Sequence, residues 1–271
     1  MSTKKRILFI TQEMSPYLDL TDYATIMNKL AVKSNESGLE VRVIMPKFGI
    51  INERRHRLHE VVRLSGINVI IDNDDYPLII KVASLPTARL QVYFLDNEDY
   101  FKRKFVFFDE NEKWFPDNAS RAVFFCKGAL ETVKKFGWPP DIIHCHGWMT
   151  SLIPLYLKTA YKKEPVFAGS KSVYSLSQNN FKEKLGPTFL KKAIISNQIK
   201  DKDMELYNEG TNVALNRGAV KFADAVALGS DKVDKKIADE AKAYKGKIVL
   251  PYHKNNEDVA DYLQLYQDLT K

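Results

Sequence analysis

The stretch Arg6-Ile-Leu-Phe-Ile-Thr11 is a continuous apolar run, which is typical of a parallel strand that is covered on both faces. A polar loop over residues 12–22 follows it. Apolar residues then recur at a helical spacing until Gly38, which suits the end of a helix. Val41-Arg-Val-Ile-Met45 has the character of a second strand, closed by Pro46. A strand, a helix and a strand in this order form a βαβ unit, so the sequence predicts a right-handed crossover.

The same alternation of strands and helices continues through the second half of the chain. We expect strands at 141–145, 166–167, 171–174, 225–228 and 247–250, helices at 118–136, 148–161, 211–222 and 231–244, and loops with short helices over 176–210. Short β-rich runs between 50 and 110 indicate an insertion or an extension of the sheet, and 96–116 has the composition of a long surface loop. The sequence therefore predicts an α/β fold with a doubly wound, Rossmann-like and mostly parallel sheet, which binds ligands beyond the carboxyl ends of its strands.

Length and composition exclude several classes of protein. The 271 residues are 45% hydrophobic and 28% charged, which excludes a wholly disordered, collagenous or coiled-coil chain. No apolar run approaches the roughly 20 residues that span a bilayer, and the basic start lacks the apolar core and cleavage site of a signal peptide. Cys126 and Cys145 are the only cysteines, too few for a disulfide framework. We therefore expect a cytoplasmic protein with no membrane contact.

The charge balance is moderately basic. Lysine and arginine total 41 and aspartate and glutamate total 34, so the net charge is 41 − 34 = +7. The lysines are spread along the chain, often beside acids, which favours a solvated surface over a nucleic-acid interface. One basic cluster, residues 102–104, is flanked by Phe101, Phe105, Phe107 and Phe108. This pattern fits a packed core best, and sugar stacking or nucleic-acid stacking less well.

Several segments, taken in order, resemble the N-terminal domain of bacterial glycogen synthases and plant starch synthases. The resemblance lies in Ile7 to Tyr17, in Glu40 to Gly49, in Tyr93-Phe-Leu-Asp96, in Asp117-Asn-Ala-Ser-Arg121, in Trp138-Pro-Pro-Asp-Ile-Ile-His-Cys-His-Gly-Trp148 and in Asn212 to Ser230. Phosphate-binding and hydrolase motifs such as Walker A and Gly-x-Ser-x-Gly are absent from the sequence. The chain is therefore identified as similar to this family over most of its length.

The resemblance implies a glycosyltransferase of the GT-B type that needs no cofactor and transfers glucose from ADP-glucose to an α-1,4-glucan. Family members have two Rossmann-like domains with the active site in the cleft between them. We expect residues 1–271 to form a single GT-B half-domain, with the β-rich insertion at about 50–110 and a covering helix at about 255–270. The second domain would then be absent, so the candidate partners are an α-glucan and a second glycosyltransferase domain supplied in trans.

The loop after the first strand is the first of three positions to which the resemblance assigns chemistry. The family has Lys-x-Gly-Gly-Leu there, and this chain has Asp19-Leu-Thr21-Asp22-Tyr23. Asp19 thus replaces the lysine, and Asp22 replaces the second glycine. A carboxylate about 4 Å from a phosphate costs on the order of 4 kcal/mol at an effective dielectric near 20. Thr21 or Asp22 also suits the N-cap of the following helix.

The second position is His144-Cys145-His146-Gly147-Trp148. Strand alternation places His144 and His146 on one face of the sheet and Cys145 on the other. The family has an aspartate after the second histidine, and this chain has Gly147 instead. Two histidines at i and i+2 can begin a metal site, but the sequence offers no third ligand nearby, so we predict no metal.

The third position is Tyr174, which stands where the family has a histidine. A tyrosine is neutral near pH 7 and lacks the charge option of an imidazole. Together with the opening turn and the start of the 118–136 helix, these positions predict a substrate-pocket rim made of Glu13, Asp19, Thr21, Asp22, Arg121, His146, Gly147, Trp148 and Tyr174.

Three hypotheses for the function follow from this pattern. The first is a glycogen or starch synthase-like domain that is inactive as an isolated chain and binds glucan or a partner. The second is a catalytic half that works with a separate second domain. The third, and the least favoured, is a nucleic-acid binder. The first is preferred because each position to which the resemblance assigns chemistry has changed while the scaffold segments remain.

Overall fold

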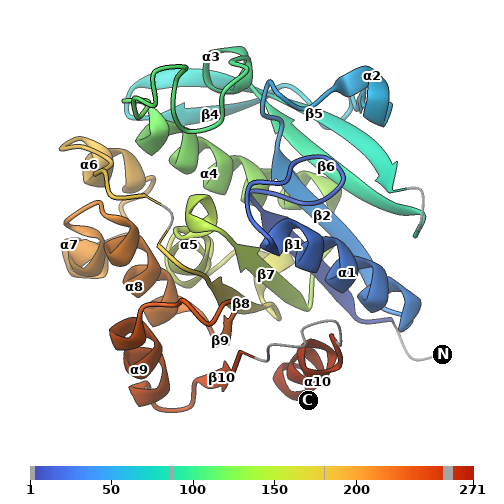
Figure 1. Cartoon of the computed structure of the whole chain (residues 1–271), viewed down its shortest axis with the longest axis vertical. Helices are drawn as coiled ribbons and strands as arrows, with labels where there is room; N and C mark the ends of the chain where they lie inside the picture. The colour runs from blue at the N-terminus through green and yellow to red at the C-terminus, as the bar shows by residue number, and fades with distance from the viewer. Residues whose placement is uncertain (1–3, 86–87, 180, 253–258) are drawn as a thin grey trace.

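The computed structural model describes residues 4–85, 88–179, 181–252 and 259–271, and it confirms the predicted α/β fold (Figure 1). The described strands are β1 (Arg6–Thr11), β2 (Glu40–Pro46), β3 (His59–Glu60), β4 (Ile67–Ile71), β5 (Asp74–Leu85), β6 (Leu90–Asp96), β7 (Ile142–His146), β8 (Lys171–Leu176), β9 (Ala225–Leu228) and β10 (Ile248–Leu250). Their order is β10-β9-β8-β7-β1-β2-β6-β5-β3, with β4 paired to β5. Neighbours from β10 to β6 are parallel, and the pairs that involve β5 are antiparallel.

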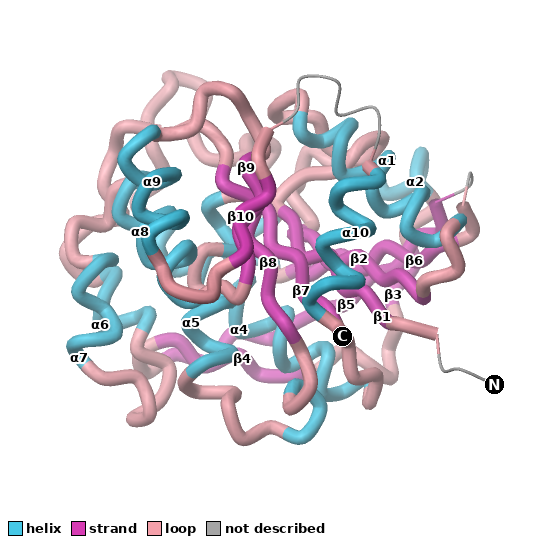
Figure 2. The backbone as a smooth tube through the Cα atoms, turned by 90° about the horizontal axis from the view of Figure 1, so that it is seen from below, coloured by secondary structure: helices cyan, strands magenta, loops and turns pink. Residues whose placement is uncertain are grey.

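Helices cover both faces of this sheet. The described α-helices are α1 (Tyr23–Glu36), α2 (Glu53–His56), α3 (Glu98–Phe101), α4 (Asn118–Phe136), α5 (Ile153–Lys158), α6 (Phe189–Ala193), α7 (Asp201–Met204), α8 (Asn212–Phe222), α9 (Lys235–Ala243) and α10 (Ala260–Leu269). Short 3-10 helices are η1 (Trp148–Thr150), η2 (Pro165–Phe167) and η3 (Glu205–Tyr207). Figure 2 shows α1 and α10 on one side of the sheet, and α4 and α5 on the other.

The register of the central strands decides which side chains share a face. Phe9 lies beside His144, and His146 lies beside Ser175, so these side chains point toward the layer of α1 and α10. Cys145 pairs with Tyr174 and points toward the opposite layer. The predicted separation of the two histidines from the cysteine is thus present in the structure.

Three local predictions differ from the structure. The predicted 148–161 helix is wrong as a single element, because it divides into η1 and α5; Pro154, which lacks an N–H group, sits in the first turn of α5, where that group is not needed. The predicted strand at 166–167 is also wrong, since Pro165 begins η2 there. Within 96–116, α3 interrupts the predicted surface loop, and its Phe101 is fully buried. Of the two interpretations of residues 50–110, the sheet extension is confirmed, because β6 pairs in parallel with β2 and antiparallel with β5.

The closing helix α10 packs on the α1 face of the sheet. Tyr266 lies edge-on to Phe9, with ring centroids 6.4 Å apart, and Tyr262 stacks on His144 at 5.8 Å. Residues 255–258 of the predicted covering helix lie outside the described residues. Because the two tyrosines are almost fully buried, α10 shields this part of the sheet from water.

Candidate functional site

The strand order changes direction between β1 and β7, where β2 and β6 extend to one side and β8, β9 and β10 to the other. In a doubly wound sheet, the loops that leave the carboxyl ends of the two strands at such a switch point diverge and leave a crevice. The loop after β1 begins at Gln12, and the loop after β7 begins at Gly147. The predicted site residues belong mainly to these two loops.

Glu13 is completely buried at the start of the loop after β1. One carboxylate oxygen accepts hydrogen bonds from the backbone N–H groups of Leu20 and Thr21 at 2.9 and 2.7 Å, and the other accepts from the Thr21 hydroxyl at 2.8 Å. Burial alone would raise the pKa of Glu13, but His146 and the donors of Thr21 outweigh it and hold the pKa below its usual value. The ionised carboxylate therefore folds the loop back on itself.

His146 packs against Tyr23, the first residue of α1. Its ring stacks on Tyr23 with centroids 3.5 Å apart and an interplanar angle of 13°. Its Nε2 lies 3.8 Å from a carboxylate oxygen of Glu13, whereas its buried Nδ1 has no hydrogen-bond partner within the described part of the chain. Burial lowers the pKa of His146 despite the opposing effect of Glu13, so the imidazole is neutral near pH 7.

A chain of buried hydroxyl and imidazole groups continues from Tyr23 toward α10. The Tyr23 hydroxyl lies 2.5 Å from the Ser175 hydroxyl, which lies 2.7 Å from Nε2 of His144. Nδ1 of His144 lies 2.7 Å from the Tyr266 hydroxyl. Burial, reinforced by the nearby His146, lowers the pKa of His144 to about 3. The described groups thus satisfy one another, and His144 serves as a neutral link between the sheet and α10.

Gly147 has a backbone conformation that only glycine adopts readily, with φ at +86°. A Cβ atom at this position would overlap the side chain of Gln12. The Gln12 backbone N–H also donates to the His146 carbonyl at 3.2 Å, which fixes the two loops against each other. The aspartate that the family resemblance implies at this place therefore has no room unless Gln12 moves.

The two aspartates of the first loop lie nearer to solvent than Glu13. Asp19 accepts a hydrogen bond from the Ser15 hydroxyl. Asp22 occupies the N-cap position of α1, but its side chain makes no capping bond; instead the Thr21 hydroxyl accepts from the Tyr23 N–H at 3.2 Å. Of the two predicted caps, Thr21 therefore caps α1.

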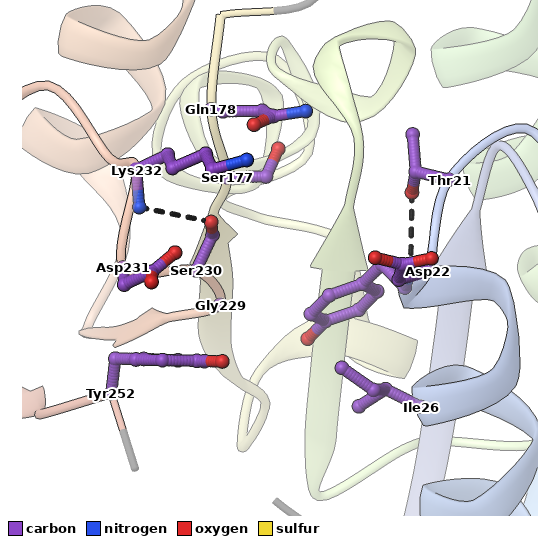
Figure 3. A pocket seen from close by; sticks show the side chains of 11 residues that line it. Thr21, Asp22, Ile26, Ser177, Gln178, Gly229, Ser230, Asp231, Lys232 and Tyr252 are labelled. Carbon is purple, nitrogen blue, oxygen red and sulfur yellow. Dashed lines mark hydrogen bonds between the residues drawn. The ribbon is translucent and has the colours of Figure 1, made fainter. Parts of the chain in front are cut away.

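A pocket of about 170 Å³ opens beside this loop, at the carboxyl ends of β8 and β9. Figure 3 shows Asp22 and Ile26 on one wall and Lys232 and Tyr252 on the other. The complete lining is Thr21, Asp22, Tyr23, Ile26, Ser177, Gln178, Gly229, Ser230, Asp231, Lys232 and Tyr252. The lining thus combines hydroxyl, amide, carboxylate and amine groups with the aromatic rings of Tyr23 and Tyr252.

The structure brings Glu13, Thr21 and His146 into one buried cluster, with Asp22 beside them in the pocket wall. It does not bring Arg121, Trp148 and Tyr174 there. A side chain that the sequence places near a loop can still point into the opposite layer.

Tyr174 points away from this cluster, because its neighbour Ser175 takes the His144 face of β8. The Tyr174 hydroxyl donates to Asn216 of α8 at 2.7 Å, and burial raises the pKa of the phenol. Trp148 is also buried, and it packs against Trp114 and Phe181 on the far side of the loop. Neither residue forms part of the pocket rim.

Arg121 is fully buried in α4, and its side chain binds backbone carbonyls of α3 and of the loop that follows α3. Its guanidinium donates to the carbonyls of Tyr100 and Val106 at 2.9 and 2.5 Å and to Asn118 at 2.7 Å. Burial, with the nearby charge of Arg103, lowers the pKa of Arg121 to about 9. These carbonyls hold the Arg121 side chain inside the protein, and it does not line the pocket beside α1.

Sequence reasoning missed the residues that complete the pocket. The predicted rim does not include Tyr23, Ser230, Lys232 or Tyr252, all of which line the pocket. The strand order alone indicates that these residues can join the site. In a parallel sheet, the loop that follows β9 lies at the same edge as the loop that follows β1. Among the described residues, no group of three or more histidine, cysteine, aspartate or glutamate side chains has the arrangement of a metal site.

Comparison with known proteins shows the family of the chain. The family model of the starch synthase catalytic domain matches residues 6–250, which is most of the chain. The chain belongs to the starch synthase catalytic-domain family. Glycogen synthases of Chlorobium phaeovibrioides and Chlorobaculum tepidum are each 36% identical to it, and each match covers 87% of this chain and 48% of the relative. The starch synthase-like chain thus spans about half the length of the relatives it matches.

A solved structure supports the fold of this starch synthase-like domain. The catalytic domain of starch synthase IV from Arabidopsis thaliana, bound to ADP and acarbose, superposes with a TM-score of 0.73. The match covers 92% of this chain and 52% of that one, at 20% identity. The likeness confirms the predicted GT-B type of Rossmann-like domain. No helix within the described residues has the length and apolar character needed to cross a membrane.

Proposed function

We propose that this starch synthase-like domain binds an α-glucan chain in the pocket beside α1 and does not transfer glucose on its own. The observation that carries the proposal is the position of Tyr23, whose ring stacks on His146 and whose hydroxyl meets Ser175. This side chain fills space at the carboxyl ends of β7 and β8, where a doubly wound fold binds its nucleotide or sugar.

The charge of the pocket supports a sugar better than a phosphate. Asp22 and Asp231 line it, and Lys232 is the single cation among its described lining residues. Carboxylates accept hydrogen bonds from sugar hydroxyls, but they repel the phosphates of a nucleotide sugar. The ring of Tyr252 offers an apolar face on which the C–H groups of a glucose unit can pack (Figure 3).

Calorimetry on the purified chain tests this function. We expect maltoheptaose to bind with a Kd on the order of 0.1–1 mM, and ADP-glucose to show no binding at the same concentrations. In a transfer assay with ADP-glucose and glycogen, we expect no incorporation of glucose. Micromolar binding of ADP-glucose, or measurable transfer by the chain alone, would refute the proposal.

A second candidate function is a catalytic lobe that works with a second domain in trans. The observation that favours it is that the chain covers about half of each glycogen synthase it matches. A mixture of this chain with an isolated C-terminal domain of such an enzyme, ADP-glucose and glycogen tests this function. Glucose incorporation above that of either component alone supports the catalytic lobe, and none in any pairing excludes it.

The proposed compartment is supported by the cysteines rather than by the pocket. Cys126 of α4 and Cys145 of β7 are both buried and free, although they lie near each other. We place the domain in the cytoplasm, where thiols remain reduced.

A further inference from the structure

A second concave surface lies at the opposite end of the sheet from the glucan pocket. It has a volume of about 450 Å³ and is formed by the turn after α5 and the segment that leads into α7. Its lining residues are Lys158, Thr159, Lys162, Lys163, Asn197, Gln198 and Lys200. We call this surface the lysine groove. Its size is within the range of small-molecule sites, which is about 300–1,000 Å³.

The position of the groove is fixed by Asp224, which immediately precedes β9. One oxygen of this carboxylate accepts from the backbone N–H of Ser172, at the start of β8, and the other pairs with Nζ of Lys158 at 2.6 Å. The groove therefore lies at the amino ends of β8 and β9, whereas the pocket lined by Ser230 and Lys232 lies beyond their carboxyl ends. The two sites are separated by the length of the strands.

The chemistry of the lining differs from that of the other cavities. Every lining side chain of the lysine groove carries an N–H or O–H donor, and none carries a carboxylate, an aromatic ring or a branched apolar group. By contrast, the glucan pocket includes Asp22 and Tyr252, and the cavity beside α6 includes Asp72 and three isoleucines. A neutral sugar needs acceptors and an apolar face, so it fits the lysine groove poorly. An anion rich in acceptor oxygens fits it well.

Two of the four lysines are already held by the protein. Lys158 is paired with Asp224, and Nζ of Lys200 donates to the backbone carbonyl of Asn197 at 2.6 Å. Within the described part of the chain, Nζ of Lys162 and of Lys163 has no carboxylate or carbonyl partner. Of the acids close in sequence, Glu164 pairs with Lys134, Asp203 accepts from the Lys200 backbone, and Asp201 is exposed at the start of α7. Two free ammonium groups thus face the groove beside two positioned ones.

We propose that the lysine groove binds a small anion that carries a diphosphate group. Two linked phosphates present several acceptor oxygens within a few ångströms, which matches four ammonium groups and two amides better than a single carboxylate does. The concave and compact shape of the groove selects a small molecule over nucleic acid, which needs an extended basic track.

Titration of the full chain with inorganic pyrophosphate tests this site. At about 20 mM NaCl we expect 1:1 binding, and we expect the Kd to rise about fivefold or more at about 300 mM NaCl, because salt screens exposed charges. The double variant K162A/K163A should weaken binding about fivefold or more. The matched control K235A/K236A removes an equivalent exposed pair at the start of α9 and should bind as the wild type does. Circular dichroism establishes that both variants fold.

Four results would overturn the proposal. One is the absence of pyrophosphate binding at low salt, and another is an equal loss of affinity in the α9 control, which would indicate attraction by net charge alone. The third is tight binding of a single-stranded RNA with no binding of pyrophosphate. The variant Lys232→Ala distinguishes this site from the glucan pocket, because it should leave pyrophosphate binding unchanged. If Lys232→Ala lost pyrophosphate binding while K162A/K163A retained it, the anion would bind in the glucan pocket, and this result would also overturn the proposal.

Discussion

The ring of Tyr23 lies flat on the imidazole of His146, with centroids 3.5 Å apart, and its hydroxyl lies 2.5 Å from that of Ser175. This one side chain joins α1 to β7 and β8 at the carboxyl edge of the sheet. The same side chain lines the pocket beside α1. The relationship therefore couples the packing of α1 on the sheet to the shape of that pocket.

Replacement of Tyr23 separates the ring from the hydroxyl. Tyr23→Phe keeps the stack and loses the bond to Ser175, so we expect a loss of about 1 kcal/mol in the free energy of unfolding. Tyr23→Ala also loses the buried ring and should cost about 3 kcal/mol or more. Thermal denaturation should show melting temperatures in the order wild type, Phe, Ala. Equal melting temperatures for the wild type and the Ala variant would contradict the stacked arrangement.

Substitution of Gly147 measures the close contact between the two crevice loops. Gly38 has nearly the same backbone conformation, with φ at +87°, but a Cβ there would meet nothing within 4 Å. Gly38→Ala should therefore cost only the backbone strain, about 1 kcal/mol. Gly147→Ala adds the overlap with Gln12 and should cost clearly more in chemical denaturation.

The double variant Gln12→Ala/Gly147→Ala is the internal control for that overlap. Its free energy of unfolding should exceed the value expected if the two single losses simply added. Additive losses would show that Gln12 does not limit the space at Gly147. We expect Gly147→Asp, which restores the residue type of the family, to destabilise the domain without producing glucosyl transfer.

Acid should weaken the fold through His144. Its folded pKa is about 3 and its ordinary value is 6.5, so between these values the unfolded chain binds a proton that the folded chain does not. The unfolding free energy therefore falls as the pH drops from about 6.5 toward 3, by a few kcal/mol in all. The carboxylate of Glu13 acts in the same direction at lower pH, since its lowered pKa gives stability that is lost as the pH falls below the unfolded value of 4.5.

Urea unfolding at several pH values checks this dependence. The variant His144→Gln has no ionisable group at this place, so its curve between pH 6.5 and 4.5 should be flatter than that of the wild type. The control His59→Gln removes an exposed imidazole and should retain the wild-type profile. A wild-type profile in His144→Gln would mean that the acid sensitivity arises elsewhere.

The fold could be predicted because its signal is local and repeated. The apolar run of β1 follows from burial on both faces of the sheet. The helical spacing of apolar residues in α4 follows from burial along one stripe of the helix. The site could be predicted only in part, because it depends on the phase of each strand. Alternation along β7 predicts that His144 and His146 share a face of the sheet. In β8, the register with β7 gives that same face to Ser175 rather than to Tyr174.

Arg121 shows a different limit of prediction. An arginine in a motif that resembles a glycosyltransferase suggests a role in binding anions. Here, however, the side chain donates hydrogen bonds to the carbonyls of Tyr100 and Val106. Which carbonyls lack a partner is decided by the path of the loop after α3, and no local pattern in the sequence reports that path.

Removal of the Arg121 guanidinium should therefore affect folding and not ligand binding. Arg121→Met keeps the length of the side chain but leaves buried carbonyls without a donor, so we expect a loss of about 3 kcal/mol or more in the free energy of unfolding. Arg121→Lys should recover only part of this loss, because an ammonium cannot span both carbonyls as a guanidinium does. A variant that kept the wild-type stability but lost maltoheptaose binding would place Arg121 in the site after all.

Tyr252 is the residue whose loss should affect glucan binding most directly. It lines the pocket opposite Ile26, and its ring is the aromatic surface of that wall (Figure 3). Tyr252→Ala should weaken maltoheptaose binding about tenfold, because the apolar face of a glucose unit would lose its packing surface. Tyr252→Phe keeps the ring and should bind within about twofold of the wild type. The stability should change little in both variants, since Tyr252 is only partly buried. Calorimetry that found the Ala variant equal to the wild type would show that glucan, if it binds at all, binds elsewhere.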